Sequence, residues 1–172
     1  PKAWRASTEA SLRVIAHLDT EIDTCERELR RQGADHPYVP LLMSAPGIGP
    51  VLAYTIAAEI GEIERFSGPK KLCGYTGLCP RVYQSGASDR RGPLAKNGPK
   101  YLRWALIEAA VHAARHPAYA AHYQATRQRL GRQRGAKVAR VEVARKLAEA
   151  IWYMLTREQT FAPQGPTAAL VA

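Results

Sequence analysis

The stretch LMSAPGIGPVLAYTI, residues 42–56, decides the fold of this chain. Its centre, Pro46-Gly47-Ile48-Gly49-Pro50, has the composition of a tight turn, and apolar residues lie on both sides of it. Glycine adopts backbone conformations that are closed to other residues, and proline is favoured in the first turn of a helix. We therefore predict two short helices, over residues 38–45 and 50–60, and Gly61 is expected to end the second.

The turn resembles the helix-hairpin-helix motif, whose pattern is PGhGxxxAxxh with h an apolar residue. Gly47 and Gly49 would let the backbone approach a phosphate at the positive N-terminus of the second helix, while Ile48 would anchor the turn in the core. Such a hairpin contacts the DNA backbone without reading its sequence, so residues 46–60 predict DNA binding. Pro50 departs from the ideal because it lacks an amide, and a plain interhelical corner is the alternative.

A seam of apolar residues near the N-terminus predicts a helix over about residues 6–32. Its members alternate spacings of three and four residues and are flanked by charge: Ile15, Leu18, Ile22, Cys25 and Leu29. Such a seam is typical of a coiled coil, or of an amphipathic helix that packs on its own chain. The first alternative predicts a homo-oligomer.

The rest of the chain predicts a mainly α fold. Apolar periodicity and glycine or proline punctuation favour helices over residues 67–74, 99–113, 117–130 and 137–157, with a turn at 131–135. Residues 75–98 are rich in glycine, proline and basic residues, which predicts a long basic, Gly-rich loop, irregular or hairpin-like. We expect three parts: a coiled-coil helix and linker (1–36), a helical domain (37–158) and a disordered tail (159–172).

Positive charge is concentrated in one part of the chain. The formal net charge is +10, yet residues 1–35 hold six Lys/Arg against seven Asp/Glu, whereas residues 65–147 hold eighteen against three. A segregated excess of this kind attracts a polyanion, so nucleic acid is the expected partner.

Membrane and secreted proteins are disfavoured. No stretch approaches the roughly 18 consecutive apolar residues that span a bilayer, and the N-terminus lacks a secretory signal, so we expect a cytoplasmic, nucleoid-associated protein. The odd number of cysteines predicts free thiols. His112 and His116 have the spacing of a metal-binding pair but lack a recognisable third ligand, so no metal site is predicted.

A serine followed by glycine, Ser85-Gly86, lies inside the basic segment 75–98. Basic side chains stabilise charge that builds on a phosphoryl group, and a hydroxyl beside them can attack the phosphate to form a covalent intermediate. The basic residues expected to ring the serine are Arg81, Arg90, Arg91, Lys96, Lys100 and Arg103. From the residues alone, Ser85 is either a nucleophile or part of a plain turn, and Ser88 competes for the same role.

The order of the motifs resembles a known family. PGIGP, then AEIG and ERF, then GYTGLCPRVYQSG, then GPLAKNGPKYLR resemble, over residues 38–125, the C-terminal domain of insertion-sequence transposases of the IS-one-ten type. The resemblance implies a serine-dependent recombinase that also carries an N-terminal RuvC-like DEDD domain and works with a structured guide RNA. It implies that Ser85 attacks DNA, that Arg90, Arg91 and Lys96 belong to the same functional block, and that a coiled coil precedes the domain.

One half of the implied active site is not found in the sequence. No acidic DEDD tetrad can be assembled, because the basic region holds only Asp89, Glu108 and Glu142. We therefore expect the chain, which begins at Pro1, to be part of a longer protein. No cofactor is expected in this chain, and Mg²⁺ is expected in the missing domain. Alone, the chain should bind nucleic acid without recombining it.

A second basic strip follows further along the chain. It holds Arg127, Arg129, Arg132, Arg134, Lys137, Arg140, Arg145 and Lys146. We predict that Arg132, Arg134, Lys137 and Arg140 contact phosphates of DNA or guide RNA; a solvated basic face is the alternative. Two other functions stay open for the whole chain: a non-catalytic helix-hairpin-helix module, and a structural RNA-binding protein.

Overall fold

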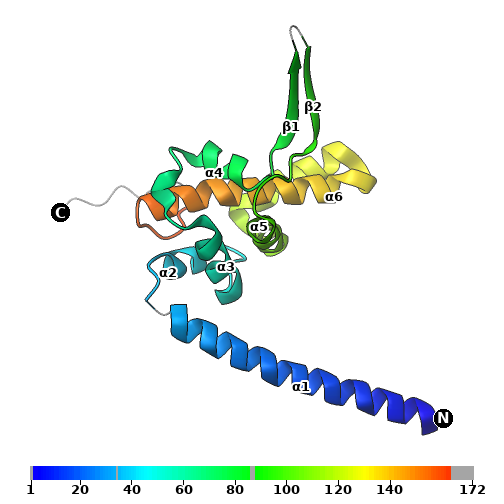
Figure 1. Ribbon diagram of the computed structural model, residues 1–172. Helices are drawn as coiled ribbons and strands as arrows, with labels where there is room; N and C mark the ends of the chain where they lie inside the picture. Colours follow the sequence, from blue (N-terminus) through cyan, green and yellow to red (C-terminus); the bar gives the residue numbers. More distant parts are fainter. Residues whose placement is uncertain (1, 34, 86–87, 164–172) are drawn as a thin grey trace. The chain divides into compact units, whose positions relative to one another are not determined.

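The computed structural model describes residues 2–33, 35–85 and 88–163 (Figure 1). The chain divides into two compact units between His36 and Pro37, and each unit is described by itself. The described residues form a mainly helical structure with one small two-stranded sheet, so the predicted fold class is confirmed in its main feature. None of the described helices has the length and apolar character that a membrane crossing requires.

The first unit is a single helix, α1, over Lys2–Gly33. It begins about four residues earlier than predicted. Its apolar seam is uncovered, because Ile15, Leu18 and Ile22 are each more than half exposed, at 54%, 52% and 54%. Near the end of α1, hydrogen bonds from Arg31 and Gln32 lower the pKa of Glu28 to about 2.

The second unit is built around α3, α5 and the second half of α6, the helix over Pro117–Thr156. Helix α2 spans Tyr38–Met43, α3 spans Pro50–Ile60 and α5 spans Lys100–Ala113. These helices confirm the predicted pair around the glycine turn and the predicted apolar stripe of α5, whose Leu102 and Leu106 are buried. The largest fully buried side chains include Leu42, Ile56, Leu72, Leu106, Leu147 and Ile151.

A short 3-10 turn, η1 over Ile63–Arg65, and helix α4 over Pro69–Tyr75 close one side of this core. The Trp152 indole donates a hydrogen bond of 2.9 Å to the backbone oxygen of Phe66, which ties the segment to α6. Cys73 of α4 contacts α6, with its thiol 3.3 Å from the backbone oxygen of Arg145. Burial, with a smaller effect of Glu149, raises the pKa of Cys73 to about 12.

Helix α6, Pro117–Thr156, folds back on itself at Gly131. Gly131 has φ 72° and ψ −175°, a conformation that favours glycine, and helical structure continues on both sides of it. The two halves therefore form a helical hairpin, and the predicted turn at 131–135 shrinks to one residue. Gly135 permits the close crossing, since a Cβ there would collide with the backbone oxygen of Arg127.

Two paired strands lie within the predicted basic loop, so its irregular form is wrong and its hairpin-like form is confirmed. Strand β1, Pro80–Ser85, pairs antiparallel with β2, Ser88–Leu94, and a register shift lies between Pro80 and Val82. Figure 1 shows the hairpin standing out from the helical body as an arm. An arm that buries neither face has no need of alternating apolar residues, and for this reason the sequence lacks the usual strand pattern.

The chain after α6 returns to the turn between α2 and α3. The Phe161 amide donates a 2.8 Å hydrogen bond to Oγ of Ser44, and the Phe161 ring lies 6.0 Å from that of Tyr119. The predicted disordered tail, 159–172, is therefore wrong for its first residues. The rest of that prediction, residues 164–172, lies outside the described residues.

Candidate nucleic-acid interface

The two glycines of the turn between α2 and α3 have different surroundings. Gly47 has φ +82°, and a Cβ on it would collide with the backbone oxygen of Ala109 in α5. Gly49 caps α3 in an extended conformation, and a Cβ on it would meet no atom within 4 Å. Ile48 is buried, as predicted. Gly47 therefore serves helix packing, while Gly49 has open space beside it at the start of α3, whose first amides have no acceptor inside the helix.

Ser85 is the last residue of β1 and lies at the far end of the arm. It is exposed and pairs with Ser88 in the strand register, and among the described residues its hydroxyl has no hydrogen-bond partner. Alternate strand residues share a face, so Arg81 and Tyr83 lie on the same face as Ser85. Arg90 is the register partner of Tyr83 and belongs to that face too. One face of the arm therefore carries both the Ser85 hydroxyl and the guanidinium groups of Arg81 and Arg90.

The base of the arm is fixed by backbone contacts. The guanidinium of Arg103 donates hydrogen bonds of 3.1 and 3.5 Å to the backbone oxygens of Gly98 and Thr76. Gly98 packs so closely on Tyr75 that a Cβ would collide with the Tyr75 backbone oxygen. Arg81 donates a hydrogen bond of 3.5 Å to the Ala95 backbone oxygen. These contacts therefore fix the base of the arm next to the start of α5.

The predicted ring of basic residues around Ser85 is divided by the length of the arm. A strand of six residues such as β1 spans about 17 Å at roughly 3.4 Å per residue. Arg90 lies near Ser85, and Arg91 is the register partner of Val82, midway along the arm. The remaining basic residues lie at or beyond the base: Arg81, Lys96, Lys100 and Arg103. The sequence predicts only one loop over residues 75–98, so it does not indicate how far these basic residues lie from Ser85.

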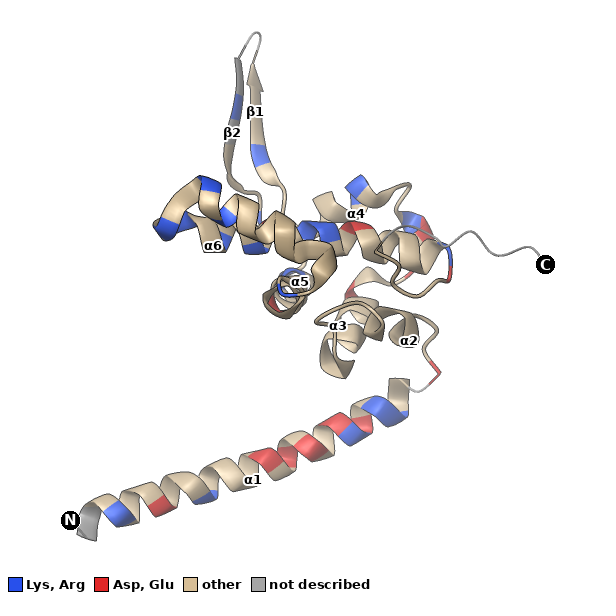
Figure 2. Ribbon diagram, turned by 180° about the vertical axis from the view of Figure 1, so that it is seen from behind, with Lys and Arg blue, Asp and Glu red and all other residues tan. Residues whose placement is uncertain are grey.

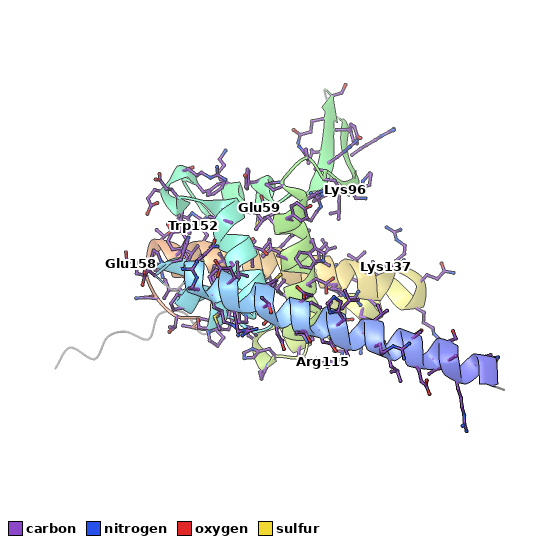
Figure 3. All side chains as sticks on the ribbon, turned by 60° about the horizontal axis from the view of Figure 1, so that its bottom comes forward. Glu59, Lys96, Arg115, Lys137, Trp152 and Glu158 are labelled. Carbon is purple, nitrogen blue, oxygen red and sulfur yellow. The ribbon has the colours of Figure 1, made fainter. Side chains whose placement is uncertain are left out.

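The tip of the α6 hairpin carries the second basic group, which we call the α6 tip. Its exposed members are Arg127, Arg132, Arg134 and Lys137, and within the described residues none of them forms an ion pair with an acid. Arg140, which is also predicted to contact phosphate, is half-buried and therefore less accessible than these residues. Figures 2 and 3 place the arm nearer to the α6 tip than to the other end of α6. The arm and the α6 tip therefore belong to the same half of the second unit.

A clasp around Glu142 holds the α6 hairpin, and sequence reasoning missed it. The Glu142 carboxylate accepts a 2.6 Å hydrogen bond from Thr126 and lies 3.1 Å from Nε2 of His122 and 3.6 Å from Arg129. Its only signal in the sequence is that Glu142 is the single acid in the second basic strip. Because Arg129 contributes to this clasp, it is less available to phosphate than its neighbours.

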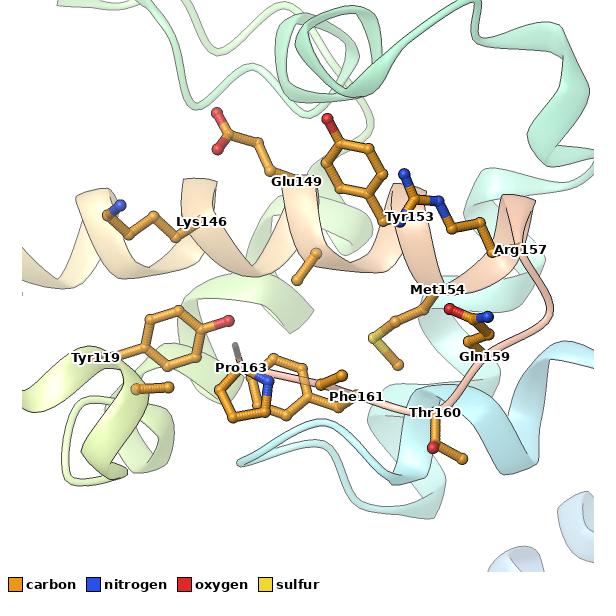
Figure 4. Close-up of a pocket in the computed structure, with 13 residues that line it drawn as sticks. Tyr119, Lys146, Glu149, Tyr153, Met154, Arg157, Gln159, Thr160, Phe161 and Pro163 are labelled. Carbon is orange, nitrogen blue, oxygen red and sulfur yellow. The ribbon is translucent and has the colours of Figure 1, made fainter. Parts of the chain in front are cut away.

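A cavity of about 450 Å³ lies between the two halves of α6 and the segment that follows it (Figure 4). Its lining includes Tyr119, Lys146, Glu149 and Phe161. Burial, and then the charge of Glu149, raises the pKa of Tyr119 to about 12. None of the predicted site residues lines this cavity. Across the part of the chain that the structure describes, no three His, Cys, Asp or Glu side chains gather as metal ligands.

A glycine turn, a serine-bearing arm and a basic helical tip define a module suited to handling nucleic acid. Comparison with known proteins identifies the family. The family described as "Transposase IS116/IS110/IS902 family" matches residues 39–125, which include the glycine turn, the arm and α5. The chain therefore belongs to the IS116/IS110/IS902 family of transposases, and the resemblance seen in the motif order is confirmed.

Individual relatives agree with the family assignment. The chain is 31% identical over 147 residues to a "Probable family 20 transposase" of Pseudomonas aeruginosa, covering 85% of this chain and 44% of that protein. It is 31% identical over 148 residues to the transposase for insertion sequence element IS1111A of Coxiella burnetii, covering 86% and 41%. A pilin gene-inverting protein of Moraxella bovis is 32% identical over 112 residues, covering 63% and 33%. The chain spans less than half the length of each of these relatives.

Proposed function

We propose that this chain is the DNA-handling, C-terminal part of a longer transposase, in which Ser85 is the nucleophile of DNA strand exchange. The observation that carries the proposal is the position of Ser85, exposed at the far end of an arm whose same face bears Arg90. A structural turn serine needs no such arm. A nucleophile that must reach a phosphate inside a large DNA complex does.

The proposed step is a transesterification. Ser85 Oγ attacks a DNA phosphorus, an Oγ–P bond forms, and the bond from phosphorus to one sugar oxygen breaks. The leaving sugar oxygen takes up a proton and the serine loses one, so the step needs no net acid, base or ATP. The phosphoserine linkage keeps the phosphodiester energy, and attack by a sugar hydroxyl of another strand rejoins DNA and frees Ser85. Arg90 would stabilise the charge on the phosphoryl oxygens.

Two other elements are proposed to hold the duplex while the arm acts. The open space at Gly49 would admit a phosphate to the N-terminus of α3, where the helix dipole favours an anion. The α6 tip would add phosphate contacts that carry no sequence choice. The exposed seam of α1 is proposed to pair with a second copy of the chain, and a structured guide RNA to supply sequence choice.

Metal chemistry is expected in another part of the transposase. The described residues do not fit a Mg²⁺ site, because they bring no sufficient group of acidic side chains together. Mg²⁺ is therefore expected on the acidic domain that the family resemblance implies, and the roles proposed for Ser85 and Arg90 do not depend on it.

The covalent intermediate tests the proposal directly. Full-length transposase incubated with a nicked suicide DNA substrate should accumulate a protein–DNA adduct that survives denaturation. Digestion and mass spectrometry should find the nucleotide on Oγ of Ser85. An adduct on Ser88 would overturn the assignment, and no adduct under conditions that support recombination would favour the non-catalytic helix-hairpin-helix module.

Salt dependence should separate basic residues that contact phosphate from those that hold the fold. Each phosphate contact adds close to one unit to the slope of log K against log salt. We expect Arg132→Ala or Lys137→Ala to lower that slope by about one, measured by anisotropy of labelled duplex DNA between about 50 and 200 mM salt.

Arg103→Ala is the matched control for this measurement. Its guanidinium already serves two backbone oxygens at the base of the arm, so the slope should stay the same while the free energy of unfolding falls by about 1–2 kcal/mol. An unchanged slope in the variants of the α6 tip would show that this tip is only a solvated face.

A further inference from the structure

Two aromatic side chains near the start of α5 are exposed, although other residues of the same turns form the core. Tyr101 is 57% exposed and Trp104 46% exposed, whereas Leu102 and Leu106 are buried. Residues three apart on a helix are neighbours on its surface, so the two rings form one patch, which we call the aromatic patch. Within the described residues, neither side chain makes a hydrogen bond, and these two are the only large exposed apolar residues of α5.

Positive charge borders the aromatic patch on the side of the arm, and Glu108, exposed one turn beyond Trp104, lies on its other side. Nζ of Lys100 lies 4.7 Å from the centre of the Tyr101 ring. Lys96 is exposed in the connection from β2 to α5, and the sequence from Lys96 to Trp104 holds no acid. A protein partner would be expected to meet aliphatic surface beside such rings, but here cations border the rings on the side of the arm. This combination suits a polyanion that also presents flat apolar faces, which describes a strand with unpaired bases.

The position of the patch relates it to the arm. Lys96 donates a 3.1 Å backbone hydrogen bond to the Gly77 oxygen, which fixes the connection between the arm and α5, and Figure 1 shows the arm rising beside α5. The arm spans about 17 Å, so a strand engaged at Ser85 could reach the patch with bases a few nucleotides away.

We infer that Tyr101 and Trp104 are a stacking platform for unpaired bases of the DNA strand that Ser85 attacks. The inference rests on the proposed function and deepens it, because exchange of strands requires bases to leave their duplex near the attacked phosphate. Stacking on aromatic rings tolerates every base, so the platform would hold the opened strand without selecting a sequence. Lys100 would meet the phosphate that accompanies a stacked base.

The test uses full-length transposase carrying Ser85→Ala, so that binding is measured without chemistry. Its probe is a single-stranded DNA oligonucleotide with 2-aminopurine, whose fluorescence is quenched by stacking. The double variant Tyr101→Ala/Trp104→Ala should lose the quench and bind the oligonucleotide about 5–150-fold more weakly. Affinity for duplex DNA should change less than about twofold. Trp104→Phe with Tyr101 intact should keep most of the quench, since a ring remains.

Tyr153→Ala is the matched control. Tyr153 lies on α6 rather than α5, it is 42% exposed, and the Arg157 guanidinium lies 4.9 Å from the centre of its ring. This variant should leave single-strand binding unchanged. Equal losses for single-stranded and duplex DNA, a larger loss for RNA of the same sequence, or a change of oligomeric state in the double variant would each overturn the inference. A failed adduct test in protein with Ser85 intact would instead count against the nucleophile, so the two failures are distinguishable.

Discussion

Ser85→Ala is expected to reduce strand exchange by the full-length transposase at least about a thousandfold. The side chain that would form the covalent bond is removed, and β1 holds no other serine or threonine that could replace it. Duplex affinity and the free energy of unfolding should both stay within about 0.5 kcal/mol of their original values, since the residue is exposed at the end of the arm. A plasmid assay for excision and integration, with anisotropy and thermal unfolding in parallel, measures all three quantities.

Ser88→Ala is the matched control for this prediction. Ser88 is the register partner of Ser85, so the same atom is removed from the same end of the arm. We expect the Ser88 variant to recombine within a few-fold of the original protein. Recombination that survives Ser85→Ala but is lost on Ser88→Ala would transfer the nucleophile to Ser88. Survival in both variants would leave the chain as a DNA-binding module of its transposase.

Local signals in the sequence predict part of this structure well. The turn at Pro46–Pro50 and the start of α5 after Pro99 are set by glycine and proline, whose backbone preferences act on their immediate neighbours. The apolar stripe of α5 follows from helical periodicity and is confirmed by the burial of Leu102 and Leu106. These features need no knowledge of distant contacts.

The features that the sequence does not predict depend on contacts between distant segments. Glu142 holds the α6 hairpin through Thr126, sixteen residues away. The arm is fixed at its base by Arg103, which the sequence groups with the phosphate-binding residues although its guanidinium serves Thr76 and Gly98. A motif identifies the residue types that a function needs. It does not show which of these side chains already form hydrogen bonds within the fold, as Arg103 does.

The glycine turn offers the sharpest test of that distinction. Gly47→Ala should lower the free energy of unfolding by about 3 kcal/mol or more, because φ of +82° costs an alanine roughly 1–2 kcal/mol and its Cβ would also collide with the Ala109 backbone. For a chain of 172 residues this corresponds to a fall in Tm of about 6–12 °C.

Gly49→Ala should have the opposite profile. Its φ of −90° suits alanine and the added Cβ has open space, so the stability change should stay below about 1 kcal/mol, the usual cost of alanine at a helix N-cap. The Cβ would, however, occupy the space where a phosphate must approach the amides of α3, and duplex affinity should fall about tenfold through the loss of one charge-assisted contact. Thermal unfolding and anisotropy on both variants separate the two roles. If Gly49→Ala binds duplex DNA as tightly as the original protein, the turn is an interhelical corner, and DNA contact must be sought on the arm and the α6 tip.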